Sequence, residues 1–263
     1  MIIKQDIQAA FFDVDGTLLS FEKHIVPNST QESLAELHRK EIKIIIATGR
    51  SAMNLNEISM LPYDGIIGLN GTSCVLRDGT TVSHHAIPHK VFIRFMELAK
   101  RYNVAVSVEG NAGVFVNQVT ARVEEMSRMI AQPLPQIRDL TQIFIPGETS
   151  QLCLFADNQT EIEIISQLPL LSSSRWCDVF ADINVAGVDK GTGLCEMVNF
   201  YGLNPSFTVA FGDGGNDIPM LRRAGIGVAM GNACDNVKDH ADFITGTVDD
   251  DGIKYALQYL GII

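Results

Sequence analysis

Two carboxylates stand at the end of an apolar run near the start of the chain. Asp13 and Asp15 follow Ala9-Ala10-Phe11-Phe12 and flank Val14. In an α/β sheet, ligands bind where the strands end. Two acids in a partly desolvated crevice repel each other unless a cation or a shared proton relieves the repulsion. We therefore take Asp13 and Asp15 as candidate active-site residues and expect a positive group to bind beside them.

The same residues have a simpler interpretation as a strand-to-turn transition, in which Gly16 supplies the turn and Asp15 caps the next segment. Three more polar clusters weaken that interpretation: Thr48-Gly49-Arg50, Lys190-Gly191 and Gly212-Asp213-Gly214-Gly215-Asn216-Asp217. Taken alone, the first two are compatible with an ordinary turn and a solvated helix start. The last is a poor ordinary loop, since it combines three glycines with two acids. Their joint occurrence at the strand ends of one sheet favours a functional site.

A phosphate monoester is a ligand that would use all of these groups. A carboxylate that approaches a phosphate dianion meets repulsion of about 4 kcal/mol for each pair of unit charges at about 4 Å, at an effective dielectric of about 20. Cations must offset this repulsion if Asp13 is the nucleophile. Asp213 can complete an oxygen shell with Asp13 and the backbone carbonyl of Asp15, which suits Mg²⁺. The sequence offers no His or Cys cluster for a softer metal.

The remaining groups share the other tasks of phosphoryl transfer. Lys190 supplies a compact ammonium that can touch both the phosphate and Asp13. Thr48 and the backbone N–H of Gly49 are expected to bind phosphate oxygens. Asp15 is left as general acid and then general base, and the neighbouring charge of Asp13 favours its starting, protonated form. An aspartyl-phosphate would divide one difficult displacement into two easier ones.

Composition limits the partners and the compartment. The chain has 263 residues, of which 46% are hydrophobic, and a formal net charge of −11 at pH 7. Such a chain can bury a large core, and its charge argues against a broad interface with nucleic acid or an anionic membrane. Five cysteines without a close pair, no bilayer-spanning stretch and no signal peptide favour a cytoplasmic protein. The sequence gives no indication of oligomeric state.

Short apolar runs alternate with helical periodicity, which predicts an α/β fold with a doubly wound parallel sheet. Asp78-Gly79 predicts a hairpin that interrupts the sheet. Residues 84–184 are then expected to form an inserted α+β domain with helices on one face of an antiparallel sheet, and residues 1–83 and 185–263 the core domain. Predicted strands lie at 42–47, 66–69, 104–108, 114–117, 152–156, 208–211, 226–229 and 243–244, with one more after Arg175, and predicted helices at 27–39, 88–102, 121–130, 161–168, 192–201, 218–224 and 252–260.

These motifs resemble those of haloacid dehalogenase (HAD) superfamily phosphatases, in particular the Cof-type group with a large α/β cap (class IIB). The resemblance covers both halves of the core and is carried by Asp13-Val14-Asp15-Gly16-Thr17, Thr48-Gly49-Arg50, Asn70-Gly71, Lys190-Gly191, the run 212–217, the run 224–233 and Ala241-Asp242. It implies a Rossmann-like HAD core and a cap that opens to admit substrate and closes to exclude water.

The resemblance also implies roles for individual residues. Asp13 would be the nucleophile and Asp15 the acid/base, with Mg²⁺ held by Asp13, Asp15 and Asp213. Around the phosphate it places Val14, Thr48, Gly49, Lys190 and Asn216, with Asp217 in a supporting role. Members of the group act on sugar phosphates, cofactor phosphates and other small phosphomonoesters.

Two other functions are compatible with the same residues. A phosphotransferase or phosphomutase needs the same Asp pair but passes the phosphoryl group to a second sugar hydroxyl instead of water. A regulator that binds a phosphorylated metabolite would keep the pocket with little turnover, which the complete catalytic set disfavours. A small phosphorylated metabolite is the expected partner in all three cases.

Overall fold

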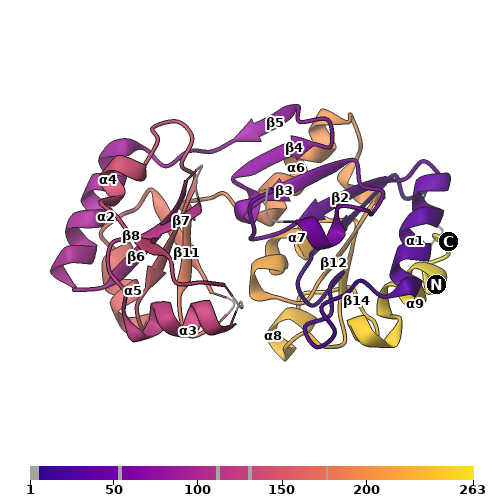
Figure 1. Ribbon diagram of the computed structural model, residues 1–263. Helices are drawn as coiled ribbons and strands as arrows, with labels where there is room; N and C mark the ends of the chain where they lie inside the picture. The colour runs from indigo at the N-terminus through magenta and orange to yellow at the C-terminus, as the bar shows by residue number, and fades with distance from the viewer. Residues whose placement is uncertain (1–5, 53–54, 111–112, 130–131, 176) are drawn as a thin grey trace. The chain divides into compact units, whose positions relative to one another are not determined.

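The computed structural model describes residues 6–52, 55–110, 113–129, 132–175 and 177–263 (Figure 1). The chain divides into two compact units. The core unit comprises Met1–Ser83 and Val188–Ile263, and the inserted unit comprises His84–Gly187. The sequence pattern placed the end of the insertion slightly earlier, at residue 184.

The core unit is built on one sheet with β1 near its centre. Across the described residues the strand order is β14-β13-β12-β1-β2-β3-β4-β5. Neighbours from β14 to β3 are parallel, whereas β4 is antiparallel to β3. The strands are β1 (Ala9–Phe12), β2 (Lys43–Ala47), β3 (Gly65–Gly68), β4 (Ser73–Leu76), β5 (Thr81–His84), β12 (Thr208–Gly212), β13 (Ile226–Ala229) and β14 (Phe243–Ile244).

Both faces of the central strands of the core sheet are buried, because successive residues of these strands enter different hydrophobic cores. On β1, Ala10 and Phe12 enter one core while Ala9 and Phe11 enter the other. Helices α1 and α9 cover the first face and contact each other (Figure 1), and α6, α7 and α8 cover the second. These helices are α1 (Asn28–Arg39), α6 (Lys190–Phe200), α7 (Ile218–Arg223), α8 (Asp235–Lys238) and α9 (Gly252–Tyr259). The predicted doubly wound α/β fold is confirmed.

Helix α6 begins at Lys190 because the preceding residue caps it. Oδ1 of Asp189 accepts a hydrogen bond from the backbone N–H of Thr192 at 2.6 Å. This satisfies one of the N–H groups that have no partner inside a helix. The cap therefore fixes where the helix starts, and with it the position of Lys190.

The hairpin predicted at Asp78-Gly79 ends the parallel part of the sheet. Oδ1 of Asp78 accepts the backbone N–H of Thr80 at 2.9 Å. Gly79 has φ of +90°, a conformation that glycine adopts without steric penalty. The strands before and after this turn, β4 and β5, extend the sheet beyond β3.

The inserted unit has its own sheet, which is mainly antiparallel. Its described strands follow the order β10-β11-β9-β6-β7-β8, and β7 and β8 are parallel. They are β6 (Ala105–Gly110), β7 (Gly113–Val116), β8 (Gln136–Ile137), β9 (Gln151–Phe155), β10 (Leu171–Ser174) and β11 (Ala181–Val185). The helices are α2 (His89–Arg101), α3 (Ala121–Met129), α4 (Leu140–Ile143) and α5 (Asn158–Ile165). Ile130, the expected last residue of α3, lies outside the described residues.

The helices of the inserted unit pack on both faces of its sheet, so the expectation of one covered face was wrong. Val106 of β6 belongs to a core with residues of α2, α4 and α5. The adjacent Ala105 belongs to a second core with Val123 and Met126 of α3. Because neighbouring residues of a strand point to opposite faces, the two cores lie on opposite sides of the sheet. The second core also contains Val116 of β7 and Phe155 of β9, and this apolar surface requires a helix on the second face of the sheet.

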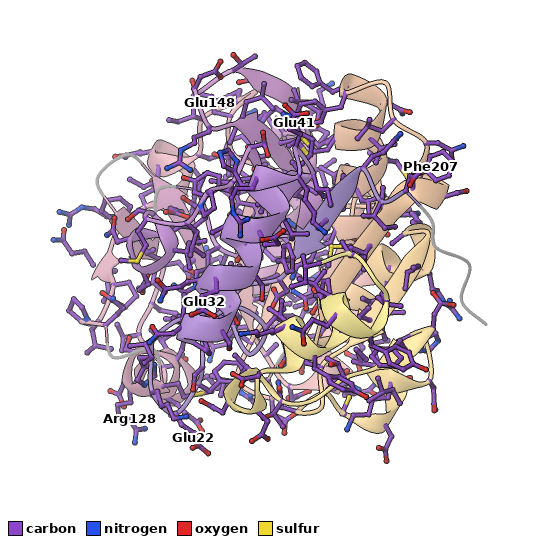
Figure 2. All side chains as sticks on the ribbon, turned by 90° about the vertical axis from the view of Figure 1, so that its right-hand side faces the viewer. Glu22, Glu32, Glu41, Arg128, Glu148 and Phe207 are labelled. Carbon is purple, nitrogen blue, oxygen red and sulfur yellow. The ribbon has the colours of Figure 1, made fainter. Side chains whose placement is uncertain are left out.

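The surface of the core unit carries part of the excess of acidic residues. Glu22, Glu32 and Glu41 are exposed, as Figure 2 shows. No helix in the described part of the chain has both the length and the apolar character needed to cross a bilayer.

Gly71 is required by both its conformation and its surroundings. Its φ is +101°, and a Cβ there would lie 2.1 Å from the carbonyl oxygen of Asp189. We expect Gly71→Ala to destabilise the protein by more than Gly79→Ala. Gly79 also has a positive φ but has nothing within 4 Å of the same position, so Gly79→Ala should cost only about 1–2 kcal/mol of conformational strain. Urea unfolding of the two variants checks this, and equal losses would contradict it.

Candidate active site

The predicted site residues follow neighbouring parallel strands of the core sheet. Asp13 directly follows β1, Thr48 follows β2 and Asp213 follows β12. Pairing continues one step past the strands, since the N–H of Asp13 donates to the carbonyl of Phe211 at 3.0 Å and that of Thr48 to Ile67 at 2.8 Å. The carboxyl ends of parallel strands share one edge of the sheet, so these loops meet there.

Lys190 lies at the centre of the site and is fully buried. Its Nζ donates to Oδ1 of Asp13 and to Oδ1 of Asp217, each at 2.6 Å. The lysine comes from α6, whereas the two acids come from the loops after β1 and β12. A buried ammonium is tolerated only when it is paired, and here two carboxylates pair it. Lys190 thus connects three segments that are far apart in the sequence.

Asp217 also supports the loop that carries Asp213. Its Oδ2 accepts the backbone N–H groups of Asp213 at 3.0 Å and Gly214 at 2.8 Å, while Oδ1 accepts Lys190. A Cβ at Gly212 would lie 2.5 Å from the Cβ of Asp217, so the chain can pass this close only with glycine at 212. Both oxygens of Asp217 are therefore engaged by protein donors, and its supporting role stays a prediction.

Three acids gather around the single ammonium of Lys190 in the described part of the site. Asp13, Asp213 and Asp217 each offer an oxygen within 4.8 Å of the others. Burial, together with the Asp217 carboxylate, raises the pKa of Asp13 well above its usual value, although Lys190 opposes this. The same two causes raise the pKa of Asp213 to about 7. Burial alone would lower the pKa of Lys190, but Asp13 and Asp217 raise it above its usual value.

A hard divalent cation fits this donor set. Carboxylate oxygens are preferred ligands of Mg²⁺, and a cation would offset the excess of negative charge in the cluster. Asp13 and Asp213 are the side chains that could hold it, because Asp217 already accepts the Lys190 ammonium and two backbone N–H groups. Asp15 does not belong to the acidic cluster of the described residues. Its predicted contribution to the metal shell is its backbone carbonyl, and this stays a prediction.

The carboxylate of Asp15 pairs with Arg50, a residue to which the sequence analysis gave no role. Nε of Arg50 donates to Oδ2 at 2.9 Å and Nη2 donates to Oδ1. Nη1 of Arg50 also contacts Oε1 of Glu57 at 3.3 Å. Two N–H groups on one carboxylate fix its direction as well as its position. The sequence could have indicated this pairing, because Arg50 directly follows Thr48-Gly49 at the end of β2, and β2 lies beside β1, the strand that precedes Asp15.

Asn70 is a second residue without a predicted role, and it binds one of the predicted phosphate-binding residues and lies close to another. Nδ2 of Asn216 donates to Oδ1 of Asn70 at 2.9 Å. A Cβ at Gly49 would lie 3.3 Å from the same oxygen. Asn70 itself has φ of +56°, which asparagine tolerates better than most residues. Thr48 lies beside them, where its Oγ1 accepts the N–H of Arg50 at 3.0 Å.

Val14 organises the loop between the two catalytic candidates. Its carbonyl accepts the N–H groups of Leu18 at 3.0 Å and Leu19 at 2.7 Å, and its side chain is buried. Gly16 in the same loop has φ of +85°, and a Cβ there would lie 2.2 Å from Oδ2 of Asp213. The loop after β1 therefore packs directly against the loop after β12.

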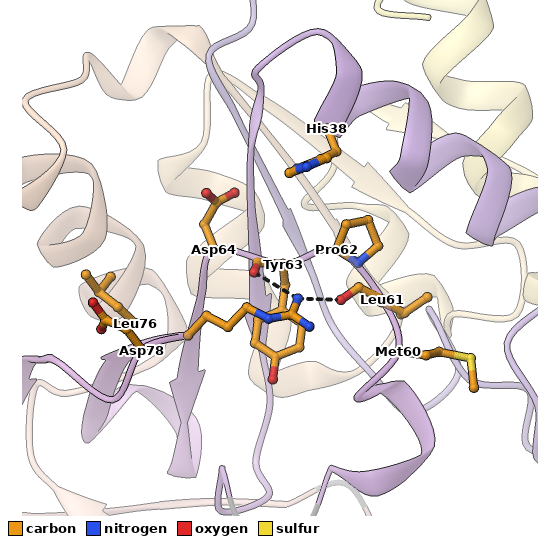
Figure 3. A pocket seen from close by; sticks show the side chains of 9 residues that line it. His38, Met60, Leu61, Pro62, Tyr63, Asp64, Leu76 and Asp78 are labelled. Carbon is orange, nitrogen blue, oxygen red and sulfur yellow. Dashed lines mark hydrogen bonds between the residues drawn. The ribbon is translucent and has the colours of Figure 1, made fainter.

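A cavity of about 560 Å³ lies elsewhere on the core unit (Figure 3). It is lined by residues of α1, of the segment before β3 and of the turn after β4, and by none of the predicted site residues. Nη1 of Arg77 donates to the carbonyl of Leu61 at 2.7 Å, and its guanidinium lies 4.5 Å from the ring centre of Tyr63. Through these two contacts Arg77 anchors the segment before β3.

The pairing of Lys190 with Asp217 can be measured by a double-mutant cycle. Lys190→Met leaves buried carboxylates without their ammonium, so we expect it to lower the free energy of unfolding by about 3–5 kcal/mol. Asp217→Asn in addition should cost less than it does alone, because the partner is already gone. The exposed pair Lys254–Glu32 is the matched control, with an expected coupling of about 0–1 kcal/mol. Urea unfolding in EDTA measures both cycles, and equal couplings would contradict the central role of Lys190.

The raised pKa of Asp213 predicts a pH dependence of stability in the metal-free protein. Its ordinary value is 3.8 and its folded value about 7, so the folded state holds this proton more tightly than the unfolded chain. The resulting stabilisation is complete below about pH 4 and is lost as the pH rises through about 7. In EDTA, the melting temperature should fall more between about pH 5 and 8 than that of Asp213→Asn, which cannot ionise. Parallel pH profiles would rule this out.

Comparison with known proteins gives a consistent result along the whole chain. The family model of haloacid dehalogenase-like hydrolases matches residues 10–257. YkrA, a putative phosphatase of Bacillus subtilis, is 32% identical over 262 residues, which cover 98% of this chain and 99% of YkrA.

Two solved structures are similar over nearly their full length. BT1666, studied among HAD phosphatases of Bacteroides thetaiotaomicron, is 48% identical with a TM-score of 0.95, covering 98% of this chain and 96% of that one. BT4131, a sugar phosphatase of HAD subclass IIB, is 35% identical with a TM-score of 0.88, covering 97% and 100%. The resemblance seen in the motifs is thereby confirmed. The chain belongs to the haloacid dehalogenase-like hydrolases, as a Cof-type, class IIB phosphatase that acts on phosphoric monoesters.

Proposed function

We propose that the protein is a Mg²⁺-dependent phosphatase that hydrolyses small phosphomonoesters through an aspartyl-phosphate on Asp13. The observation that carries this proposal is the buried Lys190 ammonium held between Asp13 and Asp217, with Asp213 beside them. An acidic cluster at the ends of parallel strands is suited to a cation and a phosphate together, because each relieves the other's charge.

Asp13 is suited to act as the nucleophile. Its Oδ1 accepts Lys190, which orients the carboxylate and leaves Oδ2 as the attacking atom. In the first step a bond forms from Oδ2 to phosphorus while the bond from phosphorus to the ester oxygen breaks. Asp15 gives its proton to that oxygen, so the product leaves as an alcohol. In the second step Asp15 takes a proton from water, and the water oxygen attacks phosphorus. The bond from phosphorus to Oδ2 of Asp13 breaks, which releases phosphate and restores the Asp13 carboxylate.

The metal has one task in this scheme. When bound by Asp13, Asp213 and the carbonyl of Asp15, Mg²⁺ would neutralise negative charge on the phosphoryl oxygens and on the nucleophile. Lys190 provides a second, fixed positive charge at the same place. Thr48 and the N–H of Gly49 would orient the phosphate, and Asn216, held by Asn70, would bind another of its oxygens.

Arg50 determines where Asp15 points before the substrate binds. Both oxygens of the Asp15 carboxylate accept its N–H groups. This keeps the acid/base out of the cluster formed by Asp13 and Asp213, where it would add further like charge. To act as the acid, Asp15 must turn at least one oxygen away from Arg50 and take up a proton on it before it can reach a leaving group.

Small sugar phosphates or cofactor phosphates are the proposed substrates. The similarity to BT4131, itself a sugar phosphatase, supports the first class. The expected localisation is the cytoplasm, where such metabolites are made.

Hydrolysis should require both Mg²⁺ and Asp13. Purified protein is incubated with p-nitrophenyl phosphate and a panel of sugar and cofactor phosphates, and free phosphate and isomeric phosphates are measured. We expect free phosphate, a loss on chelation, and a decrease of at least about 10³-fold in Asp13→Asn. Asp78→Asn, the same change in an exposed turn, is the control. An isomeric phosphate as the main product would indicate a mutase instead, and tight binding without turnover a regulator.

The covalent intermediate should accumulate in Asp15→Asn. p-Nitrophenolate leaves without a proton, so the first step needs no acid, whereas the attack of water lacks its base. We expect a burst of about one equivalent of nitrophenolate, followed by turnover slowed about 10²–10⁴-fold. Mass spectrometry should find one phosphoryl group on Asp13. A variant that turns over without a burst, and without added mass, would contradict the mechanism.

A further inference from the structure

Asn232 joins loops that follow four different strands. It lies shortly after β13, and its Nδ2 donates to the carbonyl of Gly16 at 2.9 Å and to Oδ2 of Asp213 at 3.0 Å. Its Oδ1 accepts the backbone N–H of Val248 at 3.1 Å. Gly16 follows β1, Asp213 follows β12 and Val248 follows β14. One exposed side chain therefore connects the loop after β1 and the loop after β12 to the segment after β14, which is the outermost of the parallel strands.

These three contacts need the chemistry of a primary amide. An amide provides two N–H donors on one atom and an acceptor oxygen on the other. Aspartate at 232 would place carboxylate oxygens against the Gly16 carbonyl and Asp213. A serine has one donor, and a leucine of similar size has none. The contacts thus account for the residue type and not merely for the space it fills.

Asp213 needs such a donor because its surroundings repel it. Asp13 and Asp217 place further carboxylates within 4.8 Å, and an unrestrained side chain would relieve this repulsion by turning towards solvent. Asn232 binds Oδ2, and Oγ1 of Thr17 approaches Oδ1 at 3.4 Å. Gly16 leaves the space that Oδ2 occupies. The Asn232 hydrogen bond is the shorter of the two to this carboxylate.

We propose that Asn232 is a positioning residue that keeps the Asp213 carboxylate turned into the site, in the orientation that binds the divalent cation. The inference rests on the proposed function in so far as that function includes the cation. It predicts that losing the amide weakens cation binding itself, before any chemistry takes place. Groups that orient a metal ligand typically contribute about 10- to 100-fold to metal affinity.

The test measures binding of Mn²⁺ to the metal-free protein by electron paramagnetic resonance of the free ion. The variants are Asn232→Ala, Asn232→Leu, which keeps the volume, and Asn232→Ser, which keeps one donor. We expect the dissociation constant to rise about 10- to 100-fold in the first two and less in the third. Because Asn232 is exposed, these changes leave no cavity in the core.

Two further measurements separate positioning from a general structural effect. Asn236→Ala alters an exposed asparagine of α8 and should bind Mn²⁺ as the parent does. In Asn232→Ala, the Mg²⁺ concentration for half-maximal phosphatase activity should rise by the same factor as the dissociation constant, and saturating Mg²⁺ should restore most of kcat. Melting temperatures in EDTA monitor the fold.

The outcomes distinguish this inference from the proposed function. Parent-like Mn²⁺ binding in Asn232→Ala and Asn232→Leu would overturn the inference while leaving the function intact. A lowered melting temperature with unchanged affinity would also overturn it. Failure of the parent protein to bind any divalent cation would overturn the metal-dependent function, and the inference with it.

Discussion

The burial of one ammonium between two carboxylates is the interaction on which this site depends. Lys190 is inaccessible to solvent, so its charge is tolerated only because Asp13 and Asp217 lie at 2.6 Å on either side. The same contacts orient the proposed nucleophile and anchor the loop that carries Asp213. The stability of the site and the proposed chemistry therefore depend on the same hydrogen bonds. We therefore expect a mutation at Lys190 to affect both folding and the proposed phosphoryl transfer, and measurements of activity alone would not separate the two effects.

The surrounding contacts extend this arrangement from loop to loop. Asn232 connects the loops after β1, β12 and β14, and Asn70, after β3, accepts the amide of Asn216, after β12. Arg50 connects the loop after β2 to Asp15. In each case a guanidinium or a primary amide links the ends of different strands of the core sheet. Such bridges add to the rigidity that catalysis requires.

Much of the fold was predictable because it depends on local patterns. The alternation of apolar runs with helical segments gave the parallel sheet, and Asp78-Gly79 gave its hairpin. Strand β10 was missed because Leu171 is followed by three serines, which have little strand preference and pair only because β11 lies beside them. The motifs of the site could also be recognised from local sequence, because Asp13 and Asp213 each directly follow an apolar strand. The sequence analysis gave no role to Arg50, Asn70 and Asn232, because their hydrogen-bond partners are distant in sequence. Only folding brings each of these residues next to its partner.

The position of the insertion has a consequence for how the chain is made. β1 pairs with β2 on one side and with β12 on the other, but β12 lies after the whole inserted unit. During synthesis the first five strands of the core leave the ribosome well before that partner does. Until it arrives, one edge of β1 has unpaired backbone groups flanked by Phe11 and Phe12, a surface prone to wrong pairing. The inserted unit has hydrophobic cores of its own and can fold in that interval. A compact insertion then replaces a long flexible connection, so the chain loses less entropy when the two halves of the core sheet join.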